Sequence, residues 1–200
     1  MNKPDFFYKY CSLEGVCLRH TKRMIINNEL YFASPLQFND PFDCTISFDM
    51  GNTYEEYIDW YMKFSKINKK IPKDLLPKSK NLLMTEGKKM MLKDKVYFEK
   101  LFSSLRKAHT KYLSTLGIFC MSEIGNNMLM WSHYGNSHKG ICLRFKNNAN
   151  DCFSLARKVT YSAKPFNLDI LNTSNTQIIK NFYRKSPMWK YEKEWRMAKQ

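Results

Sequence analysis

The sequence predicts an α+β fold in which short strands from both ends of the chain form one mixed or antiparallel β-sheet. Short apolar and aromatic runs bounded by turn residues occur before residue 45 and after residue 116. The long stretch between them repeats apolar residues at helical spacing. We therefore expect a single domain over residues 1–200, with a lysine-rich helical insertion at about 53–115.

Two strands and a short helix are expected before the insertion. Residues 6–11, rich in aromatics, predict the first strand, and residues 30–33 predict the second. Residues 18–27 suit a short helix that ends at a pair of asparagines. Residues 34–44 contain Pro35 and Pro41, which exclude a regular helix and indicate an ordered loop.

The middle of the chain is expected to be helical and strongly basic. Residues 53–66 and 81–115 have helical periodicity, while prolines break the region at 69–80. Residues 61–111 contain 15 basic and 4 acidic residues, so they carry +11 of the net charge of +15. Nucleic acid is one partner that this segment could bind, and a solvated charged face is the alternative. Lysine outnumbers arginine 26 to 7, a ratio that an AT-rich genome would also produce.

Strands are expected after the insertion at residues 117–121, 141–145, 157–161 and 194–198. Helices are expected at 126–134 and at 173–185, the second one ended by Pro187. Since the last strand runs almost to Gln200, we expect a C-terminus that is truncated relative to the full protein.

Composition narrows the class of protein. The chain has no apolar run of the roughly 20 residues that cross a bilayer and no apolar signal segment near Met1, so we expect a cytoplasmic protein without a membrane partner. Its six cysteines form no Cys-x-x-Cys pair, which favours reduced thiols over a zinc ribbon. The oligomeric state is not predicted.

The densest group of chemically active side chains lies at residues 131–140. This segment holds two of the four histidines, His133 and His138, together with Tyr134. Apolar strand-like runs flank it on both sides, which is the layout of a site held on a rigid scaffold. His133 is therefore a candidate catalytic residue, and Tyr134 and His138 are candidate ligand-binding residues.

Several motifs together resemble a bacterial family known as domain of unknown function 2971. They are Tyr-Lys-Tyr at 8–10, the blocks at 31–35 and 38–43, the blocks at 130–134 and 138–140, and Trp-Lys-Tyr-Glu-Lys-Glu-Trp-Arg at 189–196. The resemblance covers residues 8–196 apart from the helical middle. It implies common descent but no activity. Members of the family commonly continue beyond the last motif, which agrees with the expected truncation.

The first functional hypothesis is an ADP-ribosyltransferase-like enzyme with NAD as substrate and no covalently bound cofactor. Such enzymes use a basic residue, a Ser or Tyr and a Glu from successive strands, and Lys9, Ser34 and Glu194 occur in that order. Glu194 would stabilise the positive charge that develops on the ribose. Glu192, expected on the same strand face, would activate the nucleophile.

The remaining ligand-binding candidates of this hypothesis are Asn39, Asp40, Asp43, Tyr134 and His138. Two features depart from the transferase pattern. Lys9 replaces the expected Arg or His and lacks the planar fork that clamps a diphosphate, and Ser34 is followed by Pro35. An exposed, charged edge strand would also produce the Glu-x-Glu pattern.

Two alternatives stay open. A nucleic-acid-binding protein or nuclease could use Asp40, Asp43, His133 and Glu194, although no pair has a diagnostic metal spacing and no metal site is predicted. Turn capping equally explains the two aspartates. A non-enzymatic module for a ligand or peptide would instead line a pocket with the aromatic residues Tyr8, Tyr10, Trp131, Tyr134 and Trp195.

All three hypotheses share one geometric expectation. The loop at 39–43, the block at 133–138 and the carboxylates at 192–194 should meet in one cleft. Three polar aromatic blocks so far apart in the sequence are otherwise hard to explain.

Overall fold

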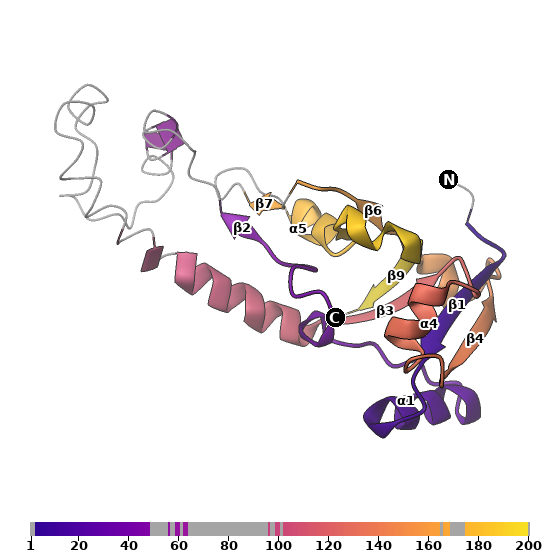
Figure 1. Ribbon diagram of the computed structural model, residues 1–200. Coiled ribbons are helices and arrows are strands. Elements are labelled where there is room, and N and C mark those ends of the chain that lie inside the picture. Colours follow the sequence, from indigo (N-terminus) through magenta and orange to yellow (C-terminus); the bar gives the residue numbers. More distant parts are fainter. Residues whose placement is uncertain are drawn as a thin grey trace. The chain divides into compact units, whose positions relative to one another are not determined.

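The computed structural model describes residues 3–48, 56, 59–60, 62–63, 96, 99–100, 102–164, 166–168 and 175–199 (Figure 1). Its contacts divide the chain into two compact units. Unit 1 comprises Met1–Thr45, Tyr112–Lys164 and Ile179–Gln200, and unit 2 comprises Ile46–Lys111 and Pro165–Ile178. The predicted site residues all belong to unit 1.

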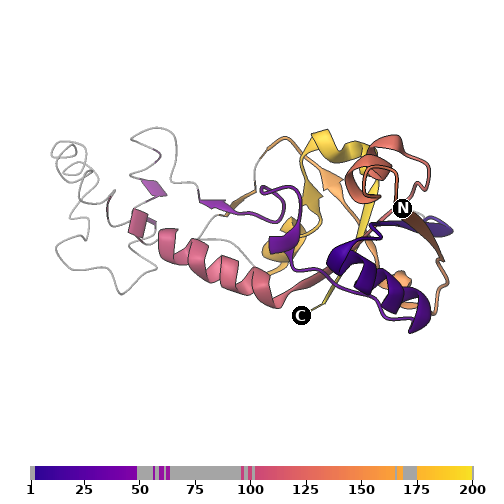
Figure 2. The ribbon, with the colours of Figure 1, turned by 60° about the horizontal axis from the view of Figure 1, so that its bottom comes forward.

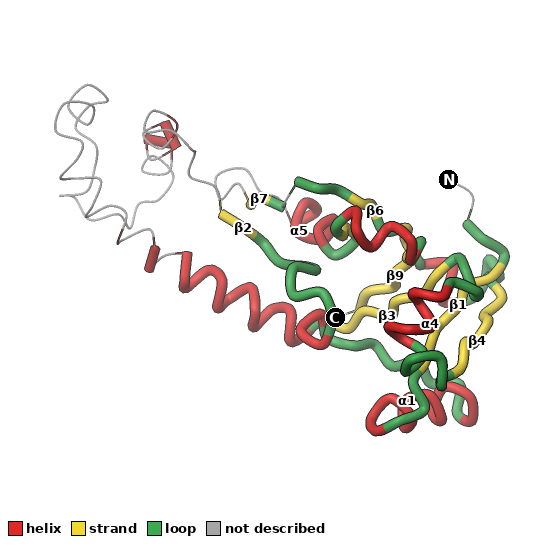
Figure 3. The backbone as a smooth tube through the Cα atoms, viewed as in Figure 1, coloured by secondary structure: helices red, strands yellow, loops and turns green. Residues whose placement is uncertain are grey.

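Unit 1 is built on a five-stranded sheet in the order β4-β1-β3-β9-β5 (Figure 3). The strands are β4 (Ile141–Lys146), β1 (Phe6–Cys11), β3 (Gly117–Ser122), β9 (Glu194–Lys199) and β5 (Arg157–Lys158). Every neighbouring pair in this sheet is antiparallel. The predicted α+β class and the antiparallel alternative for the sheet are thus confirmed.

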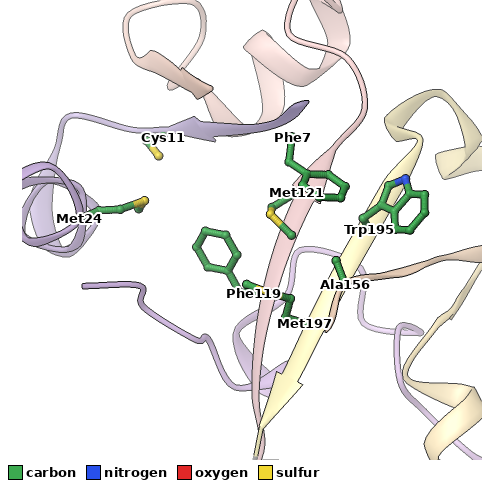
Figure 4. Packing of buried hydrophobic residues seen from close by; sticks show 8 residues of the cluster. All are labelled: Phe7, Cys11, Met24, Phe119, Met121, Ala156, Trp195 and Met197. Carbon is green, nitrogen blue, oxygen red and sulfur yellow. The ribbon is translucent and has the colours of Figure 1, made fainter. Parts of the chain in front are cut away.

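One face of the sheet carries the apolar core (Figure 4). Because side chains alternate along a strand, Phe119 and Met121 of β3 share this face with Trp195 and Met197 of β9. Helix α1 (Gly15–Ile26) covers it and contributes the buried Met24.

The other face is covered by α4 (Met128–Tyr134), whose Trp131 ring meets Tyr10 of β1 edge to face at 5.2 Å. Figure 2 shows α1 (indigo) and α4 on different sides of β1. The 3₁₀ turns η1 (Pro35–Gln37), η3 (Cys152–Leu155) and η4 (Pro187–Glu192) complete unit 1 together with a short parallel pair, β6 (Thr160–Tyr161) with β8 (Arg184–Lys185).

Unit 2 contains a second parallel pair, β2 (Ser47–Phe48) with β7 (Asn167–Leu168). Residues 56, 59–60, 62–63, 96, 99–100 and 102–115 are helical, in agreement with the predicted helical middle. The rest of that region, including most of the lysine-rich segment at 61–111 and the break at 69–80, lies outside the described residues. Helix α5 (Asn175–Asn181) follows β7 in the chain.

Three predicted elements are wrong in detail. Residues 30–33 form no strand, since only Ala33 pairs, with Ile118, before Pro35 turns the chain into η1. The predicted strand at 157–161 is interrupted at Val159. The predicted helix at 173–185 ends at Asn181, because residues 184–185 pair with β6 instead.

Asn181 gives a physical reason for the early end of α5. Its side chain donates a hydrogen bond to the Thr45 carbonyl at 2.8 Å, and the next residues turn towards β6. Tertiary hydrogen bonds here outweigh the helical periodicity of the sequence. None of the described helices is long and apolar enough to cross a membrane.

Candidate functional site

A pocket opens in unit 1 where the sheet is incomplete. Strands β1 and β3 pair only at Tyr8 and Ser122. Further along the same edge of β3, Ile118 exchanges two backbone hydrogen bonds with Ala33. Between these pairings Cys120 has no strand partner on this edge among the described residues, and the Lys9 ammonium donates to its carbonyl at 2.9 Å.

The pocket has a volume of about 420 Å³, which is within the usual range for small-molecule sites. Its lining is rich in aromatic and polar side chains from β1, α1, the loop at 31–43, α4 and β9. The aromatic ones are Tyr8, Tyr10, Tyr31, Phe38, Tyr134, His20 and His133. Flat rings beside fixed polar groups suit a ligand that has an aromatic portion and a charged or hydroxylated portion.

Arg196 stands at the centre of the polar side of the pocket and is fully buried. Its guanidinium forms a two-pronged contact with Asp43, at 2.9 Å to Oδ1 and 2.5 Å to Oδ2. It forms a second one with Glu194, from Nε at 2.8 Å and from Nη2 at 2.9 Å, and also donates to the Phe182 carbonyl. The planar fork of arginine thus fixes the loop at 39–43 to the start of β9.

Lys185 of β8 extends the same network. Its ammonium lies 2.5 Å from Glu192 Oε2, 3.3 Å from Glu194 Oε2 and 3.8 Å from Asp43 Oδ2. The other oxygen of Glu192 accepts the Tyr134 hydroxyl at 2.6 Å. We call Asp43, Lys185, Glu192, Glu194 and Arg196 the charge cluster; with all five ionised it carries one more negative than positive charge.

The two glutamates of the charge cluster differ in proton affinity. Burial alone would raise the pKa of Glu194, but Arg196 and Lys185 outweigh it and lower that pKa to about 2. Burial and the charge of Glu194 instead raise the pKa of Glu192. Burial opposes the charge on Lys185 too, yet the two carboxylates raise its pKa and keep it cationic. One carboxylate is therefore fixed as an anion, while the other accepts a proton more readily.

Local sequence explains how α4 presents its side chains. Asn127 caps the helix by accepting a hydrogen bond from the Met130 N–H at 3.1 Å, which fixes where α4 begins. Gly135 ends it. Three consecutive residues with positive φ, 136–138, then return the chain to β4. Gly140 is required at the end of this turn, because a Cβ there would lie 2.2 Å from the Cys11 carbonyl oxygen.

Most of the predicted site residues line the pocket: Lys9, Asn39, Asp40, Asp43, His133, Tyr134, Glu192 and Glu194. The three blocks therefore meet, as the sequence analysis expected. Ser34 and His138 do not line it. The Ser34 hydroxyl donates to the Leu113 carbonyl at 3.0 Å and caps η1, and His138 is exposed in the turn after α4.

Two details differ from the expected geometry. Glu192 does not share a strand face with Glu194, because it is the last residue of η4 and the left-handed Lys193 separates the two. The β9 carboxylate is also not on an exposed edge, since β9 lies between β3 and β5 and Glu194 is buried. The two carboxylates are held together by the Lys185 ammonium and not by the alternation of side chains along a strand.

The two loop aspartates have different surroundings. Asp40 accepts a hydrogen bond from the Phe42 N–H at 2.9 Å, as turn capping would require, whereas Asp43 is bound by Arg196. Within the described residues, no group of three or more His, Cys, Asp or Glu side chains is arranged to hold a metal ion.

The sequence analysis missed Arg196 and Lys185. Both are charged residues that were assigned to a terminal strand and a helix end, where exposure is the usual state. The sequence Glu-Trp-Arg-Met at 194–197 carried a usable signal. Bulky or paired side chains on both faces of a strand indicate that both faces are buried.

Comparison with known families gives one result. Residues 130–197 match the model of the family described as Protein of unknown function (DUF2971). The resemblance noted from the sequence is confirmed over this stretch. The DUF2971 match includes α4 from Met130 onward, Lys185, both glutamates and Arg196, and it ends before the last residues of β9. No curated protein and no solved structure matches the chain.

Proposed function

We propose that the pocket binds a nucleotide and breaks its N-glycosidic bond, with NAD as the candidate substrate. The observation that carries the proposal is the pair of carboxylates with opposite pKa shifts in one aromatic-lined pocket. A divergent pair of this kind is how enzymes assign a permanent charge to one group and proton transfer to the other.

Glu194 takes the role of the permanent charge. When the bond from ribose C1′ to the nicotinamide nitrogen breaks, its electron pair goes to the ring and positive charge develops on the ribose. Arg196 offsets part of the Glu194 charge, but Arg196 is also paired with Asp43. The excess of one negative charge in the charge cluster supports a cationic transition state.

Glu192 takes the role of the proton acceptor. The nucleophile, water or an acceptor hydroxyl, forms a bond from its oxygen to C1′ and gives its proton to Glu192. A raised pKa makes Glu192 a stronger base than an ordinary carboxylate at neutral pH. The Tyr134 hydroxyl and the Lys185 ammonium hold the two carboxylate oxygens in place.

Aromatic side chains supply the binding surface in this proposal. Tyr31 and His20 lie stacked at the pocket, with ring centroids 3.5 Å apart and planes 10° apart. The Tyr31 hydroxyl donates to the side chain of Gln37 at 2.9 Å. Such fixed rings favour a ligand with a flat heterocycle.

Thermal shift with a panel of nucleotides tests binding. A ligand at 100 times its Kd stabilises the folded state by about 2.7 kcal/mol, which corresponds to a rise in Tm of roughly 5–10 °C for a chain of this size. We expect NAD to be among the nucleotides that give this rise. If no nucleotide changes the Tm, the pocket does not serve this class of ligand.

Nicotinamide release tests the chemistry. Glu192→Gln keeps the shape of the side chain but cannot take a proton, so the rate should fall about 10²- to 10⁴-fold while NAD still binds. The control is Glu123→Gln, which removes a partly buried carboxylate that binds Lys158 and Trp195 outside the pocket. NAD binding without cleavage by the wild-type protein would instead favour a non-enzymatic nucleotide-binding module.

A further inference from the structure

A second group of aromatic side chains lies beside the pocket and takes no part in the proposed chemistry. It consists of His133 from α4 and Trp189 and Tyr191 from η4, which we call the ring platform. The His133 ring lies 5.9 Å from Trp189 and 6.4 Å from Tyr191, and the latter two rings are 6.1 Å apart. Each ring therefore contacts the other two.

The ring platform is accessible. His133 is exposed, and Trp189 and Tyr191 are partly exposed. Within the part of the chain that the structure describes, the polar atoms of these rings form no hydrogen bond with another residue. This holds for the Trp189 indole N–H, the Tyr191 hydroxyl and the His133 ring nitrogens. Their polar edges are thus open to a ligand, and the exposed parts of the rings can contact it.

One exposed cation lies among these rings. Lys190 is exposed and stands between Trp189 and Tyr191 in η4. The ammonium of Lys185 lies 4.7 Å from the centroid of the Trp189 ring, but it is buried and paired with Glu192 and Glu194, so it does not meet a phosphate. Aromatic rings with interleaved cations are the arrangement that binds single-stranded nucleic acid, since bases stack on the rings and phosphates meet the cations.

We infer that the ring platform binds single-stranded nucleic acid by stacking one or two bases on Trp189 and Tyr191. Lys190 contacts a backbone phosphate. Because His133 belongs both to the ring platform and to the pocket lining, a strand held there passes the pocket mouth. The inference does not depend on NAD chemistry in the pocket, and it concerns other residues than the lysine-rich segment at 61–111.

Fluorescence anisotropy with labelled 15-nucleotide oligo-dT and oligo-U tests the inference. At 150 mM salt, Trp189→Ala and Tyr191→Ala should each weaken binding about 5- to 100-fold, the usual effect of removing one stacking ring. Trp189→Phe keeps a ring and should bind within a few-fold of the wild type, and it also covers the case in which Trp189→Ala fails to fold. Circular dichroism of each variant establishes that it is folded.

Two controls separate stacking from general attraction of charge. Met188→Ala removes a side chain that is 84% exposed in the same η4 turn and should leave the affinity unchanged. Lys190→Gln should reduce the slope of log affinity against log salt by about 1, whereas Trp189→Phe should leave that slope alone. Oligonucleotide binding that is absent in the wild type, or unchanged in both ring-removal variants, would overturn the inference. Absence of binding by the wild type would favour a peptide as the ligand of the ring platform. Unchanged binding by both variants would assign oligonucleotide binding to lysines elsewhere.

Discussion

Removal of Arg196 is the sharpest test of the charge cluster. Arg196→Met replaces the fully buried guanidinium with an apolar side chain of similar length. Asp43 and Glu194 then stay buried without their main partner, because each loses two hydrogen bonds. Breaking a buried ion pair from one side costs about 3–5 kcal/mol. For a chain of 200 residues this lowers the Tm by roughly 6–20 °C.

Thermal and urea unfolding, followed by circular dichroism, measure this loss. Arg144→Met is the matched control: Arg144 is exposed on β4, and loss of its contact with the Phe6 ring should cost no more than about 1 kcal/mol. In an Asp43→Asn background the loss of stability caused by Arg196→Met should be smaller, since one of the two unpaired buried charges is absent. A loss of less than about 1 kcal/mol in the single variant would show that the charge cluster does not hold the loop at 39–43 to β9.

Three further outcomes follow from the geometry. Gly140→Ala should destabilise the protein by about 1–3 kcal/mol in urea unfolding, because the added Cβ would clash with the Cys11 carbonyl; an unchanged midpoint would contradict this close approach. Ser34→Ala should cost about 1 kcal/mol through the lost cap of η1 and the lost bond to Leu113, yet leave nucleotide affinity intact, and a large drop in affinity would return Ser34 to the site. The pKa of Glu194 is lower in the folded than in the unfolded state, so its stabilising contribution is present above the ordinary Glu pKa of 4.5 and disappears as pH falls towards about 2. Glu194→Gln should therefore flatten the loss of stability between about pH 5 and 2 in an acid titration, and an equally steep loss would refute the assignment.

Four of the five strands of the sheet could be predicted from their short apolar and aromatic runs. The predicted strands at 6–11, 117–121, 141–145 and 194–198 each end within a residue of the observed strands. The short parallel pair of β6 with β8 could not, since its hydrogen bonds join residues more than twenty positions apart and replace a helix that the local pattern favours. The isolated pairing of Ala33 with Ile118 could not be predicted from local sequence either.

The location of the candidate pocket was predictable from its unusual residues, but its electrostatics were not. His133, Tyr134 and the two glutamates were recognised from their density in apolar surroundings, and they line the pocket. The partner of Glu194 is Arg196, two residues along the same strand, together with a lysine from an unexpected strand. Charged side chains in a short terminal strand resemble a solvated edge until the tertiary structure buries them.

The pH dependence of nicotinamide release tests the proposed function most directly. If Glu192 is the base, kcat/KM should fall as pH drops through a pKa above the ordinary value of 4.5, and Glu192→Gln should lose both the rate and this acidic limb. Glu194, with its pKa near 2, should add no limb in the same range. Failure of the wild-type protein to release nicotinamide at any pH, or an acidic limb that persists in Glu192→Gln, would contradict the proposed roles of the two carboxylates.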